Sequence, residues 1–157
     1  MVSVLFVCTG NICRSPTAEG VFRAMVAAQG LSGVITMDSA GTGSWHEGEP
    51  PDERSQEAAA RRGIDISGQR ARKVTKADFK EFDLIMALDR GHHHNLSRLC
   101  PRGEEHRIQM FMGYAPELGI LDMPDPYVGD GDGFENVFDM VEICSRGLLT
   151  EIRENLL

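Results

Sequence analysis

The sequence predicts one α/β domain over residues 1–157: an open, four-stranded parallel sheet with helices on both faces. Short apolar runs alternate with segments of helical periodicity, the pattern of successive strand–helix–strand units. The length of 157 residues suffices for one hydrophobic core and leaves little room for two. No internal repeat or linker-like composition divides the chain, so a single domain is expected.

The first strand and the first helix are the most clearly marked elements. Residues 2–7 (VSVLFV) form a nearly continuous apolar run, typical of a buried parallel strand. The helix that follows has Ser15 as its expected N-cap, Pro16 in its first turn and Gly30 at its end. Between these two elements the sequence predicts a polar, glycine-containing loop.

The remaining elements follow from apolar runs, helical periodicity and turn residues. In chain order they are a strand at 34–39, a loop at 41–51, a helix at 52–62, a short helix signalled by Thr75 and Asp78, a strand at 83–88, a polar helix to Leu99 and a strand at 108–111. A Pro-, Gly- and Asp-rich stretch at 113–133 precedes a long amphipathic helix. The expected buried stripe of that helix is Phe134, Val137, Phe138, Val141, Cys144, Leu148 and Ile152.

Composition and charge weigh against several classes of function. The chain carries 16 Lys and Arg against 24 Asp and Glu, a net charge of −8, which disfavours a nucleic-acid partner. No apolar run approaches the ~18 residues of a membrane span, so no membrane partner is expected. The chain starts on an apolar strand without a basic signal region, and its four scattered cysteines are typical of reduced thiols. A cytoplasmic location is therefore expected.

The chemistry-bearing residues concentrate at 8–15 (CTGNICRS), between the first strand and the first helix. In open α/β sheets, ligands bind at the carboxyl ends of strands, where free N–H groups and the helix dipole favour an anion. The segment therefore predicts a phosphate loop whose amides surround a tetrahedral oxyanion, with Arg14 as a forked donor. The other loop residues expected around the phosphate are Thr9, Gly10, Asn11, Ile12 and Cys13.

Cys8 is the predicted nucleophile of this loop. Positive surroundings lower the pKa of a thiol from about 8.5 into the ~3.5–7.5 range, which favours the thiolate at neutral pH. Ser15 is placed to donate a hydrogen bond to the sulfur, and attack on phosphorus gives a cysteinyl-phosphate intermediate. The amides and Arg14 would hold the equatorial oxygens. Phosphate or other oxyanions are the expected ligands, and neither a metal nor another cofactor is needed.

The leaving oxygen needs a general acid, and Asp125 is the candidate. Pro124 and Pro126 flank it and stiffen the loop, which fixes the direction of the carboxyl group. Asp125 would protonate the departing oxygen and then act as a base on the attacking water. An Asp beside Pro is also an ordinary turn residue, so the residues alone leave both readings open.

Residues 8–16 (CTGNICRSP) resemble the signature of the low-molecular-weight protein tyrosine phosphatases. Residues 38–42 (DSAGT), followed by Trp45, resemble the second strand and pocket wall of that family. Residues 125–127 (DPY) resemble its general-acid loop. These ordered motifs span nearly the whole chain. The sequence SAGT at residues 39–42 is more similar to bacterial than to eukaryotic members.

The resemblance implies a metal-independent hydrolase that acts on tyrosine-phosphorylated proteins and aryl phosphates. It implies the same roles for the catalytic residues Cys8, Arg14, Asp125 and Ser15. By position, Asn11 and Ser39 belong to a supporting hydrogen-bond network, and the cleft is lined by Ile12, Trp45 and Tyr127. Such a slot suits an aromatic ring and is too deep for phosphoserine to reach the thiolate.

Two positions depart from the family pattern. Gln69 stands where many relatives have a His, which is expected to alter the network through Ser39. Val128 stands where eukaryotic members often have a second Tyr, so a tandem-tyrosine regulatory site is not expected.

Other functions on the same scaffold stay open at this point. Phosphoarginine phosphatases resemble this chain but have Thr at the position of Ile12, whereas Ile favours an aromatic ring. An arsenate reductase needs two further neighbouring cysteines, and Cys100 and Cys144 are 44 positions apart. A phosphate-binding module without turnover is the third alternative.

Three further features of the sequence have interpretations of their own. Consecutive side chains on a helix diverge by about 100°, so His92 to His94 are expected on a solvated face and not at a metal. Asp130 and Asp132 lack a full calcium-loop pattern and predict a hydrated turn. Cys13 either packs the loop or traps an oxidised Cys8 as a reversible disulfide.

Overall fold

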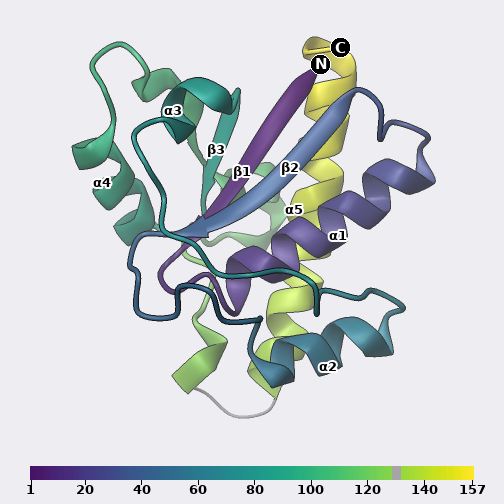
Figure 1. Cartoon of the computed structure of the whole chain (residues 1–157). Coiled ribbons are helices and arrows are strands. Elements are labelled where there is room, and N and C mark those ends of the chain that lie inside the picture. Colours follow the sequence, from purple (N-terminus) through teal and green to yellow (C-terminus); the bar gives the residue numbers. More distant parts are fainter. Residues whose placement is uncertain (129–131) are drawn as a thin grey trace.

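A four-stranded, all-parallel sheet in the order β2-β1-β3-β4 forms the centre of the computed structural model, which describes residues 1–128 and 132–157 (Figure 1). The strands are β1 (Val2–Cys8), β2 (Ile35–Gly41), β3 (Leu84–Ala87) and β4 (Ile108–Met110). This confirms the predicted fold class. All four carboxyl ends lie along one edge of the sheet, where an α/β fold binds its ligands.

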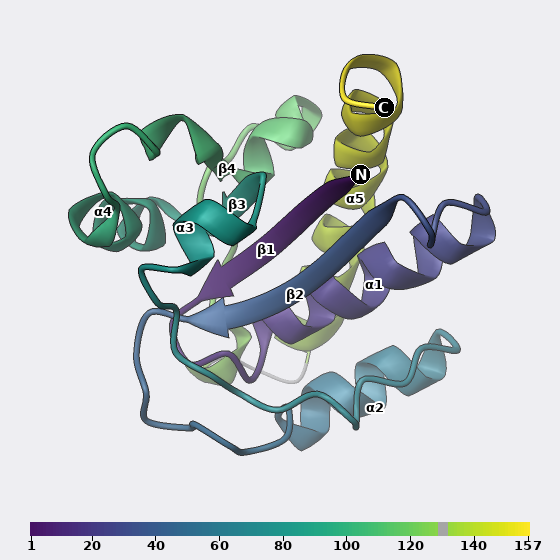
Figure 2. The same ribbon diagram turned by 45° about the horizontal axis from the view of Figure 1, so that its top comes forward.

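Helices cover both faces of the sheet, as predicted. They are α1 (Arg14–Ala28), α2 (Glu53–Arg61), α3 (Asp78–Glu81), α4 (Arg90–Leu99) and α5 (Asp132–Asn155). Helices α1, α2 and α5 lie on one side, and α3 and α4 lie on the other (Figure 2). Short 3-10 turns occupy Glu105–Arg107, Phe111–Tyr114, Pro116–Leu118 and Pro126–Val128. No helix in the described ranges combines the length and apolar character that crossing a membrane requires.

The central strand β1 explains why its sequence is nearly continuously apolar. Phe6 faces α1 and α5 and makes edge-to-face contacts with Phe22 and Phe111, at ring-centroid distances of 5.6 and 5.2 Å. Leu5 and Val7 point to the opposite face and pack in the second core cluster. Because both faces of β1 are covered, the usual alternation of apolar and polar residues is lost.

The start of α1 corrects one prediction. The N-cap residue is Cys13, and Ser15 lies inside the first turn, so the prediction of Ser15 as the cap is wrong. The physical reason is that the Ser15 hydroxyl lies 2.9 Å from the sulfur of Cys8 instead of binding a free helix amide. At the other end, Gly30 adopts a φ of 73°, as expected of a residue that closes a helix.

Each of the four strands differs from its predicted range by one or two residues at one end or both. Strand β2 runs from Ile35 to Gly41, and the amides of Val34 and Ile35 both bond back to the Leu31 carbonyl in the preceding turn. Strand β4 ends at Met110, and Phe111 opens a 3-10 turn that packs its ring under β1. Shifts of one or two residues at element ends are common when a turn competes for the terminal hydrogen bonds.

Helix α5 has the amphipathic character that its sequence predicts. Every residue of the predicted apolar stripe is buried against the sheet side that α1 also covers. The helix begins at Asp132. Asp130, the other half of the suggested hydrated turn, lies with Gly129 and Gly131 outside the described residues.

Candidate active site

The loop that joins β1 to α1 curls at the carboxyl edge of the sheet and is held there by β2 and its extension. Thr42 and Gly43 donate backbone hydrogen bonds to the carbonyls of Cys8 and Thr9, at 2.9 and 3.0 Å. Gly41 lies directly below, and a Cβ at this position would come within 2.6 Å of the Thr9 carbonyl oxygen. The absence of a side chain at Gly41 therefore lets the loop approach the end of β2.

Asn11 turns the loop and fixes its shape. It has a φ of 58°, the one positive φ outside glycine in the described residues. Its side-chain amide donates to the hydroxyls of Ser15 at 2.8 Å and Ser39 at 3.0 Å. Its side-chain oxygen, Oδ1, accepts a hydrogen bond from the backbone N–H of Arg72 at 3.0 Å. The strained backbone is therefore supported by side-chain hydrogen bonds on both ends of the amide group.

The sulfur of Cys8 lies inside this curl. The backbone N–H of Asn11 points at it from 3.3 Å, and the Ser15 hydroxyl oxygen is 2.9 Å away. Ser15 already accepts from the amide of Asn11, so its single proton is free to bond the sulfur, which is nearer than the Ala40 carbonyl at 3.4 Å. Both contacts place hydrogen-bond donors at the sulfur.

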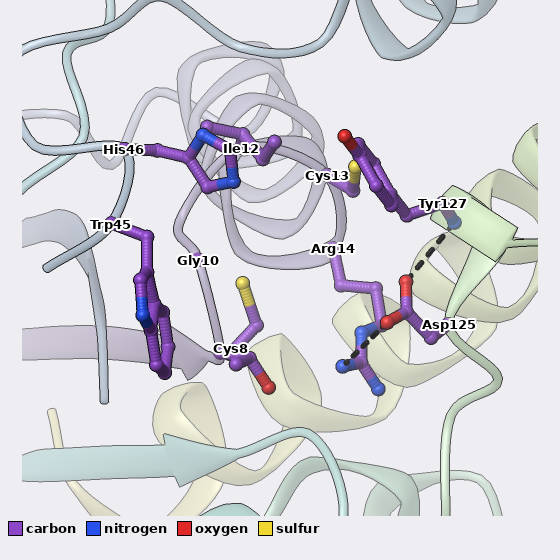
Figure 3. Close-up of a pocket in the computed structure, with 10 residues that line it drawn as sticks. Cys8, Gly10, Ile12, Cys13, Arg14, Trp45, His46, Asp125 and Tyr127 are labelled. Atoms are coloured by element: carbon purple, nitrogen blue, oxygen red, sulfur yellow. Dashed lines mark hydrogen bonds and ion pairs between the residues drawn. The ribbon is translucent and has the colours of Figure 1, made fainter. Parts of the chain in front are cut away.

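Arg14 is the buried cation of the site, with 5% of its surface exposed. One terminal nitrogen, Nη1, donates to the Asp89 carboxylate at 3.1 Å and to the Met123 carbonyl at 2.8 Å. The other, Nη2, lies 3.9 Å from Asp125. Arg14 thus joins the phosphate loop to the turn after β3 and to the segment that carries Asp125. Figure 3 shows Arg14 beside Asp125.

A pocket opens above Cys8 (Figure 3). It is lined by Cys8, Thr9, Gly10, Ile12, Cys13, Arg14, Trp45, His46, Asp125 and Tyr127. The structure therefore brings together the predicted nucleophile, the predicted acid and the predicted aromatic walls. Asn11, Ser15 and Ser39 lie behind the pocket as buried supports.

The outer wall of the pocket is aromatic and exposed. Trp45 is 75% exposed and Tyr127 48% exposed, so both rings stand free to meet a substrate. The Arg54 guanidinium lies 5.4 Å from the centroid of the Tyr127 ring. The backbone amide of Tyr127 donates to Asp125 Oδ1 at 3.0 Å, which holds the carboxyl group in a fixed direction.

A model of the family described as "Low molecular weight phosphotyrosine protein phosphatase" matches residues 3–156. The chain belongs to this family. A low molecular weight protein-tyrosine-phosphatase of Streptomyces coelicolor is 47% identical over 98% of this chain and 94% of its own. Relatives of this chain are named protein-tyrosine-phosphatases, so the chain belongs to a family of enzymes.

Solved structures agree with this membership. A protein tyrosine phosphatase from Entamoeba histolytica, crystallised with Hepes in its active site, superimposes with a TM-score of 0.95 at 35% identity and covers both chains fully. An arginine phosphatase from Drosophila superimposes with a TM-score of 0.90 at 28% identity, over 97% of this chain and 98% of its own.

The structure resolves how this phosphatase accommodates Gln69. The side-chain amide of Gln69 donates a hydrogen bond to the backbone carbonyl of Pro16 at 3.1 Å and makes none to Ser39. Ser39 instead donates to the carboxylate of Glu19 at 2.7 Å. Glu19 is buried in α1 and was missed by sequence reasoning, because an acidic residue in a helix carries no signal of such a role.

Three other residues of the site were also missed. His46 lines the pocket, Asp89 pairs with Arg14, and His92 contacts the loop. The expectation that His92 lies on a solvated face is wrong: it is 3% exposed, whereas His94 is exposed. The available signal was position, because Asp89 and His92 directly follow the carboxyl end of β3.

Cys13 differs from Cys8 in its surroundings. Burial, and secondly the negative charge of Asp52, raise the pKa of the Cys13 thiol to about 12. The thiol is therefore neutral at physiological pH, although it lines the same pocket as Cys8.

Proposed function

We propose that this phosphatase hydrolyses protein phosphotyrosine and aryl phosphates through a cysteinyl-phosphate intermediate, with Cys8, Arg14 and Asp125 as its catalytic residues. The observation that carries the proposal is that all three side chains line one pocket, with the nucleophile at its floor. We infer that residues 1–157 act as one domain, since the two core clusters share the two faces of a single sheet.

In the first step the phosphoryl group enters the curl of the loop, and the Cys8 thiolate attacks phosphorus. The sulfur–phosphorus bond forms as the bond to the aryl oxygen breaks. Asp125 gives its proton to that oxygen, so tyrosine leaves as a neutral phenol. The loop amides and Arg14 stabilise the charge on the three equatorial oxygens.

In the second step water replaces the sulfur. Asp125, now ionised, takes a proton from the water as its oxygen attacks phosphorus. The sulfur–phosphorus bond breaks and Cys8 returns as a thiolate. Ser15 donates to the departing sulfur and so stabilises it as a leaving group. Each step is carried by side chains and amides of the chain itself.

The walls of the pocket support an aromatic substrate. Ile12 gives an apolar inner surface, and Trp45 and Tyr127 present ring faces at the mouth. A phenyl ring bridges the distance from the mouth to the sulfur and gains burial on the way. Phosphoserine has no such ring, so its peptide backbone would meet the rim of the pocket before its phosphoryl group reached the sulfur.

Hydrolysis of aryl phosphates by the wild type, Cys8→Ser and Asp125→Asn tests this mechanism. Cys8→Ser should show no detectable turnover while it still binds phosphate. Asp125→Asn should lose far more activity on phosphotyrosine than on nitrophenyl phosphate, because nitrophenolate leaves without a proton. Equal losses on the two substrates would rule out Asp125 as the acid.

Phosphoarginine is the second candidate substrate, favoured by the structural similarity to the Drosophila arginine phosphatase. Ile12 argues against it, because its side chain in the pocket wall has no hydroxyl for the guanidinium or the attacking water. Rates on matched phosphotyrosine and phosphoarginine peptides decide between the two, and we expect phosphotyrosine to be faster by at least about tenfold.

An arsenate reductase is not supported by the placement of the cysteines. Cys100 packs with the cluster on the α3 and α4 side of the sheet, and Cys144 is in the core on the α1 and α5 side. The sheet separates these two thiols, so they cannot form a relay with Cys8.

We infer that the enzyme works in the cytoplasm. Cys8 and Cys13 are free thiols in one loop, and a reducing compartment keeps such a pair in the active form. Tyrosine-phosphorylated proteins are the proposed partners, and phosphate is the proposed product ligand of the loop. The SAGT motif supports assignment to the bacterial branch of the family.

A further inference from the structure

His92 is a buried imidazole at the back of the phosphate loop, and the proposed mechanism does not use it. It belongs to the first turn of α4, where Asp89 caps the helix by accepting the His92 amide at 2.7 Å. The ring reaches the loop from the end of a different strand. Its Nε2 lies 2.9 Å from the Thr9 hydroxyl and 3.5 Å from Nη2 of Arg14.

The neighbours of the ring assign its protonation state. A guanidinium nitrogen can only donate, so Nε2 must present its lone pair to Arg14, and the Thr9 hydroxyl can donate to the same atom. The ring proton then sits on Nδ1, which lies 3.2 Å from a carboxylate oxygen of Asp89 but makes no hydrogen bond to it or to any other side chain in the described residues. Besides Arg14 and Asp89, the charged groups that act on the ring are Asp122 and Asp125. Burial and the charge of Arg14 lower the pKa of His92 to about 4.

The contacts of Arg14 show what this acceptor does. Nη1 is held by Asp89 and by the Met123 carbonyl, and Nη2 lies 3.5 Å from His92 Nε2 and 3.9 Å from the Asp125 carboxylate. In the described residues, Arg14 Nε makes no hydrogen bond. The edge of the guanidinium that carries the Nε proton and one Nη2 proton is therefore available to bind an anion. His92 and Asp89 therefore anchor one edge of the guanidinium and leave the other edge facing phosphate.

We propose that neutral His92 is a positioning residue, which orients Arg14 and Thr9 for the phosphoryl group by accepting hydrogen bonds at Nε2. This rests on the proposed function for the role of Arg14 in turnover, but the effect on anion binding holds without turnover. Protonation of the ring would place a donor and a positive charge against Arg14 and turn the guanidinium away from its anchored position.

Two substitutions separate positioning from packing. His92→Gln is expected to retain the function, because its amide oxygen can reach the Nε2 position and accept, but it does not titrate. His92→Leu fills similar space and accepts nothing. Inorganic phosphate is the probe, and its dissociation constant at pH 7 is measured by calorimetry, which needs no catalysis. Hydrolysis of nitrophenyl phosphate is measured alongside.

For His92→Leu we expect phosphate binding and kcat/KM to weaken together by roughly ten- to a hundredfold, the range for a lost hydrogen bond to a charged group. His92→Gln should lie within about threefold of the wild type. Equal phosphate affinity in all three proteins, or a Gln variant as weak as the Leu variant, would overturn the proposal.

A pH series adds a readout that packing alone does not move. Between pH 7 and 4 the ratio of the wild-type to the His92→Gln dissociation constant cancels the ionisation of phosphate itself. We expect this ratio to rise below about pH 5 as the ring of His92 takes up its proton. A constant ratio contradicts the proposal, and this arm decides the matter if His92→Leu does not fold. Loss of turnover with the binding pattern intact would instead point to failure of the proposed mechanism.

Discussion

At the scale of single residues, Asn11 combines an unusual backbone conformation with a full set of side-chain hydrogen bonds. The two properties can be separated, because glycine tolerates a φ of 58° and alanine does not. Both substitutions remove the bonds to Ser15, Ser39 and Arg72.

We therefore predict that Asn11→Gly and Asn11→Ala lose similar activity but differ in stability. Asn11→Ala should be less stable than Asn11→Gly by about 1 kcal/mol, the cost of the left-handed conformation for a residue with a Cβ. Urea unfolding of the two variants measures this difference, and kcat on an aryl phosphate measures the shared loss. If alanine proved the more stable, the strained backbone would not be a feature of the folded loop.

Cys13 is the second residue whose role can be tested directly. Its raised pKa, about 12, keeps the thiol protonated, so peroxide should oxidise Cys8 first. Sulfenic acid on Cys8 can then condense with the Cys13 thiol to a disulfide with release of water. In Cys13→Ser, oxidation should continue to forms that thiols cannot reduce.

The measurement is the fraction of activity that dithiothreitol restores after a peroxide pulse. We expect nearly full recovery for the wild type and for the control Cys100→Ser, whose thiol is outside the site. Recovery should be small for Cys13→Ser. Equal recovery in all three would leave Cys13 as a packing residue only.

Single residues of the site also differ in whether the sequence predicts their role. Cys8, Arg14 and Ser15 occupy one short segment, so the strand–loop–helix pattern alone places them together. His92 and Glu19 act through contacts with residues far away in sequence. The position of His92 after β3 indicates the site but not its partner, and the segment of Glu19 indicates neither. Three consecutive histidines on a polar helix even favoured the opposite interpretation.

At the scale of elements, strands and helices with strong periodicity were predicted within a residue or two. Strand β1 and helix α5 are the clearest cases, because both are buried over most of their length and hydrophobicity decides their position. The short 3-10 turns between residues 111 and 128 were missed. Their residues satisfy local hydrogen bonds and carry no apolar period that a sequence pattern could show.

The contact of α5 with the turn at 111–114 allows a prediction at this scale. Gly147 lies in α5, and a Cβ there would overlap the backbone carbonyl oxygen of Tyr114. Alanine favours a helix by about 1 kcal/mol over glycine, but a backbone atom cannot move aside cheaply. We expect Gly147→Ala to lower the free energy of unfolding by about 2 kcal/mol in spite of the better propensity.

Gly133→Ala in the same helix is the matched control. Its Cβ would lie 3.5 Å from Pro126, an ordinary contact, so no loss of stability is expected. Denaturant unfolding of both variants provides the comparison. Stability of Gly147→Ala equal to that of the control would show that α5 and the turn pack less closely than the structure indicates.

At the scale of the whole molecule, the active site depends on three segments that meet only in the folded state. The end of β1 and the start of α1 supply Cys8 and Arg14, the N-terminus of α4 supplies Asp89 and His92, and the segment before α5 supplies Asp125. The parallel topology was predictable from the alternation of strands and helices. Which side chains of the β3 turn point into the site depends on the cap geometry of α4, which the alternation does not determine.

This convergence links the site to global stability, because His92 is buried as a neutral ring. Its pKa is lowered from 6.5 to about 4, first by burial and then by the charge of Arg14. Between these two values the unfolded chain binds more protons than the folded one. The contribution of His92 to stability is therefore complete above pH 6.5 and is lost as the pH falls towards 4.

We predict that His92 alone accounts for a loss on the order of 3 kcal/mol in the free energy of unfolding across that window. Acidic groups with lowered pKa values, such as Asp52, act in the same direction but titrate in His92→Gln as well. The quantity to measure is thus the difference in the free energy of unfolding between the wild type and His92→Gln. Urea unfolding at several pH values between 7 and 4 provides it. It should shift in favour of His92→Gln as the pH falls, because the glutamine takes up no proton. Parallel stability profiles would mean that the ring of His92 protonates equally well in the folded and unfolded chain, and so is not enclosed beside Arg14.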